Sequence, residues 1–516
     1  MALLRSIATV GGFSLLSRIT GFARDILVAN ALGAGMVADV FFVAFKFPNL
    51  FRRLFAEGAF SAAFVPIYAA MIDQKGQGPA DQFARRSLSV LGVVLVAFVG
   101  LMEVAMPWAM YVFAPGFDAV PGKIELAVEL TRVTFPYLVF ISIVSLQAGV
   151  LNSIGRFAAA AGTPILLNLS LIAALLALTP HVETPGHALS WGVAAAGVLQ
   201  LLWLWVSCAR AGVRLFPVVP RFDPDVRLLA RRILPVAFGA GLYQINLLVD
   251  TVLASMVAEG AVSYLYYADR VNQLPLGVVG VAVGTALLPL LARRLAAGDA
   301  AGAMDSQNRA LEFALLLTVP SCVALALTAG PIVSVLFQRG AFGPVERDAT
   351  AAALAAFAVG LPAYVLIKVF TPGFFARHDT ATPVKVAGIA LVANIVFSLV
   401  LMWPLAHVGI ALASALASWL NAGMLAVILH RRGHFVVDAR LRRRLPRLLV
   451  ATAVFAGLLA VGRWGLEGYL AGPLAMRAAA LAALVAGGVV CFGVLLQVTG
   501  TARLSELKRF ARRDVT

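Results

Sequence analysis

Apolar stretches long enough to cross a lipid bilayer follow one another along almost the whole chain. A membrane-spanning helix needs about 20 consecutive, mostly apolar residues, because the hydrocarbon core is about 30 Å thick. Fourteen stretches meet this requirement, and several are long enough to tilt or bend. They are residues 6–31, 36–70, 86–113, 125–150, 160–180, 187–209, 233–257, 262–291, 310–337, 348–374, 384–403, 408–429, 447–463 and 473–498. The pattern predicts an all-α polytopic membrane protein with about 14 transmembrane helices.

The low content of charged residues excludes a water-soluble fold. Charged residues make up 13% of the 516 residues, and hydrophobic residues make up 61%. Soluble domains carry about 25% charged residues, so this chain lacks the polar groups needed to cover a surface in water. The solvent of most of its surface is therefore lipid.

The net charge of +16 is explained by topology, and we expect no nucleic-acid partner. Arginines and lysines gather in alternate loops, most densely between Arg431 and Arg447 and in the last residues of the chain. Cytoplasmic loops of membrane proteins carry such an excess of Lys and Arg. An even number of spans with this bias predicts that both termini are cytoplasmic.

The chain also contains an internal repeat with an offset of about 220 residues. The matching segments are Pro107–Phe113 with Pro331–Phe337, Phe135–Tyr137 with Pro362–Tyr364, and Arg156 followed by Thr163-Pro164 with Arg377 followed by Thr382-Pro383. Six helices per copy is an even number, so the two copies have the same orientation in the membrane. Parallel repeats of this kind are known in transporters.

The repeat predicts three parts. Residues 1–215 form an N-lobe, residues 216–435 form a C-lobe, and residues 436–516 contain two extra helices and a basic cytoplasmic tail. The cleft between two such lobes is the natural path for transport. We therefore expect alternating access, in which rocking of the lobes opens the path to each side in turn.

Charged residues inside the predicted spans are the candidate functional residues. A central Arg or Lys costs about 2.5–3.5 kcal/mol even on the lenient insertion scale. The cations in spans outnumber the acids, so an anionic ligand is the economical explanation. The cations are Arg18, Arg24, Lys46, Arg52, Arg53, Arg132, Arg270 and Lys368, and the acids in or near spans are Asp25, Asp39, Glu57, Glu103, Asp250 and Asp269.

Spacing along the helices separates these residues into pairs. Arg53 and Glu57 are four residues apart and can pair, which leaves Arg52 available for a ligand. Asp39 shares a helical face with Lys46, as does Arg18 with Asp25. The other interpretation is that such residues form structural ion pairs, and it applies most to Arg53, Glu57 and Asp269.

A cation site and a catalytic site are less well supported than an anion site. Asp250 and Asn394 could offer oxygens to a small cation, although a lone Asp and Asn more often make local hydrogen bonds. The chain has no P-loop and no His-Glu-x-x-His motif. We expect a transporter and not an enzyme, without a cofactor, and driven by the membrane potential or a monovalent ion.

Several motifs resemble those of a known family. The segment Ser17–Asp25 and the segment Gly33–Ser61, which holds Asp39, Lys46 and the Arg52-Arg53 pair, closely resemble the MurJ (MviN) lipid II flippases. The similarity continues at Tyr266–Arg270, at Gly280–Thr285, and at Lys368 with Pro372–Phe374, and it spans all fourteen helices.

The resemblance implies the fold of the multidrug/oligosaccharidyl-lipid/polysaccharide exporter superfamily. It also implies movement of lipid II, the undecaprenyl-pyrophosphate-linked precursor of peptidoglycan, from the cytoplasmic to the outer leaflet of the bacterial inner membrane. Cell-wall synthesis proteins are then candidate partners, beside lipid II and membrane lipids. The family's cavity arginines match Arg18, Arg24, Arg52 and Arg270, with Asp25, Asp39, Lys46, Arg53, Glu57, Asp269 and Lys368 as further charges for gating or for the cavity.

One departure from the family concerns Gln273, where some relatives have an acidic residue, so a gating pair at that position is in doubt. Two alternatives remain. A related exporter of another polyprenyl-linked saccharide or of a drug would share the fold, but a cationic drug favours an acidic cavity. A membrane-embedded glycosyl- or phosphotransferase needs clustered acidic metal ligands at one membrane face, which the sequence does not offer.

Overall fold

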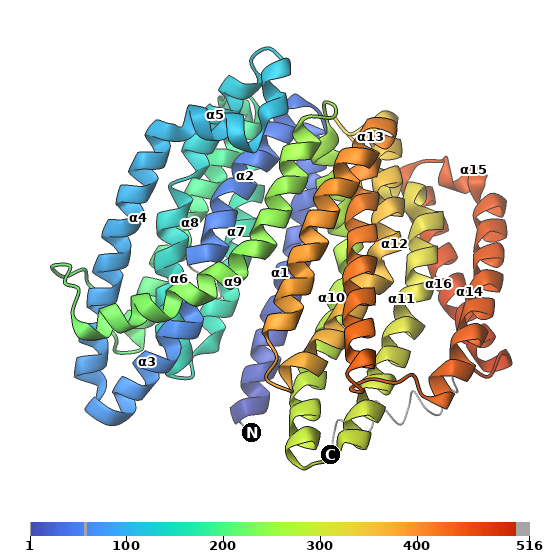
Figure 1. Cartoon of the computed structure of the whole chain (residues 1–516). Helices are drawn as coiled ribbons and strands as arrows, with labels where there is room; N and C mark the ends of the chain where they lie inside the picture. Colours follow the sequence, from blue (N-terminus) through green and yellow to red (C-terminus); the bar gives the residue numbers. More distant parts are fainter. Residues whose placement is uncertain (1, 56–58, 502–516) are drawn as a thin grey trace. The chain divides into compact units, whose positions relative to one another are not determined.

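The computed structural model describes residues 2–55 and 59–501, apart from some side chains within helices (Figure 1). The described part is helical, with short turns and loops between the helices. Contacts between residues divide it into two compact units. Unit 1 contains Met1–Ser263 and Arg339–Phe342, and unit 2 contains Tyr264–Gln338 and Gly343–Thr516.

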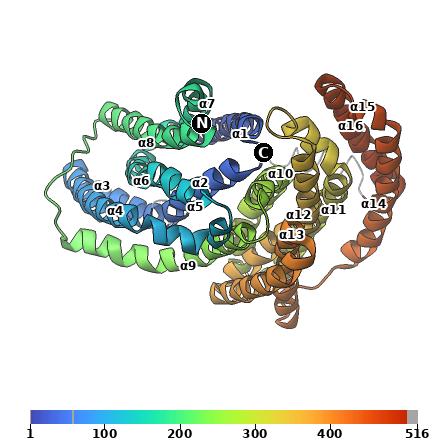
Figure 2. The ribbon, with the colours of Figure 1, turned by 90° about the horizontal axis from the view of Figure 1, so that it is seen from above.

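The described residues of unit 1 contain nine complete α-helices. They are α1 (Ala2–Leu32), α2 (Met36–Phe55), α3 (Ala59–Lys75), α4 (Gln77–Phe113), α5 (Lys123–Thr134), α6 (Tyr137–Ser153), α7 (Phe157–Leu178), α8 (Pro185–Arg210) and α9 (Pro224–Ser255), with the short 3₁₀ helices η1 (Pro115–Ala119) and η2 (Thr179–His181). Helix α7 packs against both α1 and α8 (Figure 2). Helix α2 packs against α5, α6, α8 and α9, so it lies in the interior of the unit.

Unit 2 contains the remaining helices. They are α10 (Ala261–Ala296), whose first three residues belong to unit 1, and α11 (Ala300–Phe337), α12 (Pro344–Phe375), α13 (Ala381–Arg431), α14 (Ala439–Gly465), α15 (Glu467–Leu470) and α16 (Leu474–Val498). Helices α11, α12 and α13 form its core together with the C-terminal half of α10. Helices α14 and α16 pack against α11 (Figure 2).

The predicted spans fall on helices where the structure describes them, but span 36–70 covers both α2 and α3, and span 125–150 is divided between α5 and α6. Among the described residues, nine helical segments are long and apolar enough to cross a membrane. Their outer faces are apolar and exposed, and in α16 only 17% of the span is buried. Such faces require lipid. The chain is therefore an all-α, multi-pass membrane protein, while the number of fourteen crossings and the three predicted domains stay predictions.

Helix α13 illustrates why segments and crossings differ in number. It runs for 51 residues but leaves the helical conformation at Ala406, where φ is 50°. Pro404 stands just before this point, and a proline inside a helix removes one backbone hydrogen bond. The break falls between the predicted spans 384–403 and 408–429, so the single helical segment contains both.

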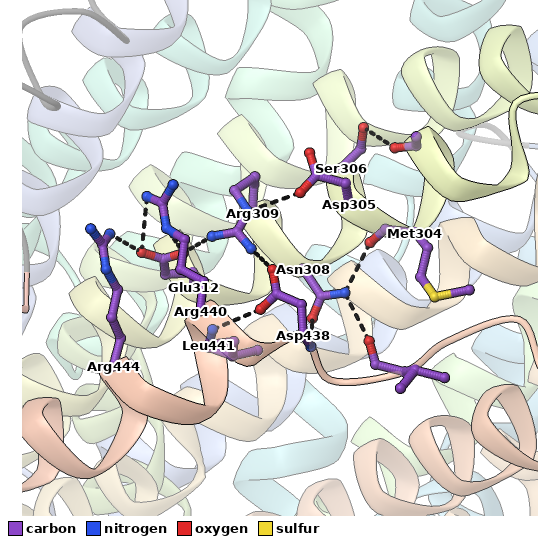
Figure 3. A network of polar contacts seen from close by, with 12 residues as sticks. Met304, Asp305, Ser306, Asn308, Arg309, Glu312, Asp438, Arg440, Leu441 and Arg444 are labelled. Atoms are coloured by element: carbon purple, nitrogen blue, oxygen red, sulfur yellow. Dashed lines mark hydrogen bonds and ion pairs between the residues drawn. The ribbon is translucent and has the colours of Figure 1, made fainter.

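A cluster of charges fixes the start of α14 on α11 (Figure 3). The carboxylate of Glu312 in α11 is bound by three arginines, Arg309 of α11 and Arg440 and Arg444 of α14. Arg309 also pairs with Asp438, just before α14. Because Glu312 is only 14% exposed, these pairs are less screened by water than ordinary surface ion pairs.

Hydrogen bonds next to this cluster define where α14 begins. The carboxylate of Asp438 accepts the N–H of Leu441 at 2.7 Å, which is the usual bond of a helix N-cap. Asn308 of α11 accepts the N–H of Asp438 at 3.3 Å and donates to the carbonyl of Val436 at 2.9 Å. The two C-terminal helices of unit 2 are therefore attached through polar groups as well as through apolar packing.

Candidate functional site

Arg24 on α1 is the best-ordered cation of the predicted site. Its side chain is buried, with 7% of the residue exposed. Its Nε and Nη2 atoms donate to Asp25 at 3.0 and 2.7 Å, and its Nη1 atom donates to Asn168 at 2.9 Å. The guanidinium also lies over the ring of Phe45 on α2, 5.7 Å from its centroid. These contacts from three helices hold the guanidinium in one orientation.

Asn168 was not among the candidate residues, and it is the element that joins α7 to the site. Besides accepting from Arg24, it donates to the carbonyl of Ser17 at 3.0 Å. Gly21 makes this approach possible, because a Cβ at that position would lie 3.3 Å from the Asn168 amide nitrogen. An amide within the apolar span 160–180 was the one sequence signal for this contact.

The other predicted residues of α1 and α2 are less enclosed. Arg18 is exposed. Arg52 is partly buried, and its Nε donates to Asn49 at 3.0 Å. Lys46 is partly buried and donates to Thr251 of α9 at 3.4 Å. The side chain of Arg53 and the whole of Glu57 lie outside the described residues, so their predicted pair stays a prediction.

Asp39 lies in a closed polar cluster within unit 1. It is fully buried, and Lys123 at the start of α5 donates to it at 2.9 Å. Backbone N–H groups of Gly260 and Ser263 donate at 2.8 and 3.0 Å, and the Ser263 hydroxyl at 2.7 Å. Lys123 also lies over the ring of Phe117, 4.5 Å from its centroid. Asp39 thus fixes the turn between α9 and α10 to α2 and α5.

Unit 2 carries the remaining predicted charges on α10 and α12. The guanidinium of Arg270 lies over the ring of Tyr266, 4.8 Å from its centroid. Asp269 accepts a hydrogen bond from Gln273, the position that departs from the family pattern. Lys368 on α12 lies against Gly280 on α10, where an added Cβ would stand 2.8 Å from the lysine Nζ.

The predicted cation site is divided between the two units. Asp250 is on α9 of unit 1, and Asn394 is on α13 of unit 2, where it is buried and accepts from Ser414 at 3.4 Å. The described residues contain no cluster of three or more His, Cys, Asp or Glu side chains that could hold a metal ion. A site shared by Asp250 and Asn394 stays a prediction.

The charges near α1 and α2 are unequal in sign. Unit 1 places Arg18, Arg24, Lys46 and Arg52 on these two helices, whereas Asp25 and Asp39 are the acids on their described residues, and Asp39 is bound by a further cation from α5. Arginine binds phosphate through a planar fork of N–H groups, often by two bonds at once. The described residues of α1 and α2 thus carry more cations than acids.

Comparisons with known proteins agree with one another. A family model described as "Lipid II flippase MurJ" matches residues 28–477. A probable lipid II flippase MurJ from Rhizobium meliloti (strain 1021) is 45% identical over 522 residues, which cover 100% of this chain and 97% of the relative. A lipid II flippase MurJ from Burkholderia cenocepacia is 36% identical and is covered to 97%, over 96% of this chain.

Solved structures share the fold. A lipid II flippase MurJ in an inward closed conformation superposes with a TM-score of 0.78, at 23% identity over 95% of this chain and 98% of that chain. An inward-facing multidrug resistance transporter of the MATE family, in the MOP superfamily, gives a TM-score of 0.67 at 14% identity, over 81% of this chain and 94% of that chain.

Proposed function

The chain belongs to the MurJ family of lipid II flippases, and we propose that it binds the pyrophosphate of lipid II with the arginines of α1 and α2 in unit 1. A contribution of Arg270 on α10 stays a prediction. Its function is to move lipid II, the lipid-linked peptidoglycan precursor, across the membrane. It is a transporter and not an enzyme. The proposal concerns which residues hold the headgroup and how the movement is driven.

The excess of cations over acids on the described residues of α1 and α2 is the observation that carries the proposal. Cations inside apolar helices are costly unless water, counter-ions or a ligand compensates them. Arg24 is already oriented by Asp25, Asn168 and Phe45, so little side-chain entropy is lost when an anion approaches it. The exposed Arg18, six residues earlier on α1, is available for direct contact with phosphate oxygens.

The proposal also includes a direction and a driving force for transport. We place both termini in the cytoplasm, because the basic loops alternate along the sequence. We place the protein in the bacterial inner membrane, as its family implies. Transport by alternating access then carries lipid II from the cytoplasmic to the outer leaflet. The membrane potential acts on the cationic site with about 2.3 kcal/mol per charge per 100 mV and can reset it; a monovalent ion is the other driving force, and cell-wall synthesis proteins are candidate partners.

The experiment is depletion of the protein in its own bacterium, with measurement of the lipid II that is accessible at the outer leaflet. Cells are complemented with the wild type, with Arg18→Ala, or with Lys75→Ala. Arg18 and Lys75 are both exposed, so neither change disturbs the packing of the unit. Lys75 lies at the end of α3 and serves as the matched control for lost charge.

We expect lipid II export to be restored by the wild type and by Lys75→Ala, but not by Arg18→Ala at equal protein abundance. Arg24→Lys is a second variant, which keeps the charge but lacks the fork that contacts both Asp25 and Asn168. Full export by both arginine variants, in a strain without another flippase, would contradict the proposed binding site.

A further inference from the structure

The last helix of each copy of the internal repeat ends in the same way. In unit 1, α8 ends at Arg210 and is followed by Ala211 and Gly212, with φ of 85° at the glycine. In unit 2, α13 ends at Arg431 and is followed by Arg432 and Gly433, with φ of 68°. In unit 1 this end lies next to the start of α7, which follows Arg156. In unit 2 the end of α13 lies next to the start of the same helix, which follows Arg377, because α13 is interrupted at Ala406.

In unit 2 an acidic side chain of the protein itself occupies this place. Asp379, two residues after Arg377, accepts the N–H and the hydroxyl of Thr382 at 2.9 and 2.6 Å. Arg432 donates to the same carboxylate at 2.6 Å. The surrounding positive charge is also felt by His434, because burial together with Arg377 and Arg432 lowers the pKa of this histidine. The carboxylate of Asp379 therefore neutralises part of a cationic corner.

In unit 1 the corresponding residues are alanines. Counting from Arg156 the equivalent of Asp379 is Ala158, and counting back from the Thr-Pro pair it is Ala160. Ala158 lines a cavity of about 370 Å³. Arg156 and Arg210 both line it, and its wall includes Thr9, Ser207, Leu151 and Phe157. This copy thus keeps the counterparts of Arg377 and Arg431, has Ala211 where unit 2 has Arg432, and has no acidic residue among those that line the cavity.

Trp203 indicates the depth of the cavity in the membrane. Its ring is 47% exposed, and its indole N–H donates to the carbonyl of Ala159, a wall residue, at 3.1 Å. Tryptophans at this kind of position gather at the level of the lipid headgroups. The apolar residues Leu199 and Leu202, within about one turn of Trp203 on α8, are exposed, as expected for a surface next to hydrocarbon. The cavity therefore lies at headgroup level, where phosphates of membrane lipids are available.

We propose that this cavity of unit 1 binds the phosphate of an anionic glycerophospholipid, held by Arg156 and Arg210 beside Ala158, the counterpart of Asp379. Basic pockets between transmembrane helices bind such headgroups. The apolar wall residues Leu151 and Phe157 suit the glycerol and the first methylenes of the acyl chains. The proposal is independent of the lipid II site, because all lining residues lie outside the residues assigned to that site.

The test is native mass spectrometry of the full-length protein in detergent, titrated with phosphatidylglycerol and, in parallel, with phosphatidylcholine. Arg156→Ala/Arg210→Ala removes the two cations of the cavity. Arg231→Ala/Arg232→Ala removes two exposed cations of α9 in the same unit and is the matched control. Ala158→Asp keeps both arginines but supplies the internal carboxylate, and Ala158→Asn is its neutral control.

We expect the wild type to bind phosphatidylglycerol more tightly than phosphatidylcholine. Arg156→Ala/Arg210→Ala and Ala158→Asp are expected to weaken phosphatidylglycerol binding about tenfold or more, the size of one lost charge-assisted hydrogen bond. The two control variants should keep the wild-type affinity. Ala158→Asp retains every arginine. Weaker binding by this variant, but not by Ala158→Asn, would therefore come from the added carboxylate and not from damage to folding.

Two results would overturn the proposal. Equal phosphatidylglycerol affinity in Arg156→Ala/Arg210→Ala and in its matched control would place the lipid elsewhere. Binding of phosphatidylglycerol by the wild type no tighter than binding of phosphatidylcholine would show that the cavity does not select an anionic lipid.

Discussion

The buried pair of Lys123 and Asp39 gives a sharp test of how unit 1 is held together. Removing one partner of a buried ion pair costs about 3–5 kcal/mol, because the other charge stays buried without compensation. In Lys123→Met the apolar stem is retained over Phe117, but the ammonium group that contacts Asp39 is lost. Three donors, from Gly260 and Ser263, still reach the carboxylate. The expected cost is therefore at the lower end, about 3 kcal/mol.

The cost is measurable as a shift in melting temperature. Unfolding entropy is about 2.1 cal/mol/K per residue, which for 516 residues makes about 1 kcal/mol correspond to a shift of about 1 °C. We expect Lys123→Met to lower the Tm of the detergent-solubilised protein by about 3 °C. Thermal scans followed by size-exclusion chromatography measure the fraction that stays folded.

A double variant separates the ion pair from other effects of the substitution. In Lys123→Met/Asp39→Asn neither of these two positions carries a charge, and the Asn oxygen can still accept from Ser263. The double variant should therefore recover at least half of the lost Tm, since the effects of contacting residues are not additive. Strictly additive losses, or a shift of less than about 1 °C in the single variant, would refute a structural ion pair. Unchanged Tm with lost export would instead support the prediction that Asp39 is a cavity charge.

Three further predictions concern unit 2. Hydrogen bonds from Thr382 hold the pKa of Asp379 well below its usual range. The stabilisation is therefore fully present above about pH 4 and is lost as the pH falls further, so the Tm difference between wild type and Asp379→Asn should be constant from pH 7 to 5 and shrink below pH 4. Gly280→Ala displaces the amine of Lys368 and should lower lipid II export, whereas Gly284→Ala, whose added Cβ meets no described heavy atom within 4 Å, should not. Glu312→Gln weakens the attachment of α14 and should lower the Tm by about 2 °C, as expected for charged hydrogen bonds worth about 2 kcal/mol.

The helices were predictable from the sequence because the bilayer leaves a chain few choices. Every backbone polar group must be paired inside the membrane, so an apolar stretch of this length is helical. Interruptions of the helices were harder to predict, since a proline can end a helix, bend it or leave it continuous. Pro404 accompanies a break in α13 at Ala406, whereas Pro164 is accommodated within α7. The difference depends on packing between helices and not on the proline itself.

The charged residues of the site were predictable, but their partners were not. A charge in an apolar span is visible in the sequence, and Arg24, Asp25 and Asp39 were found in this way. Spacing along α2 placed Asp39 on one face with Lys46, yet its carboxylate is bound by Lys123, 84 positions further along the chain. Likewise Asn168 contacts Arg24 from 144 positions away. Periodicity describes one helix, whereas these contacts depend on how helices pack.

Arginine clusters carry two kinds of information that a sequence does not separate. The group between Arg431 and Arg447 was interpreted only as a sign of the cytoplasmic side, because every arginine counts equally toward that bias. In the structure Arg440 and Arg444, one turn apart on α14, bind Glu312, whereas Arg442 and Arg443 are exposed. Helical periodicity allows one cluster both to orient the chain and to attach α14 to α11. A substitution that neutralises Arg444 should therefore affect stability, and one at Arg443 only the local charge at the membrane surface.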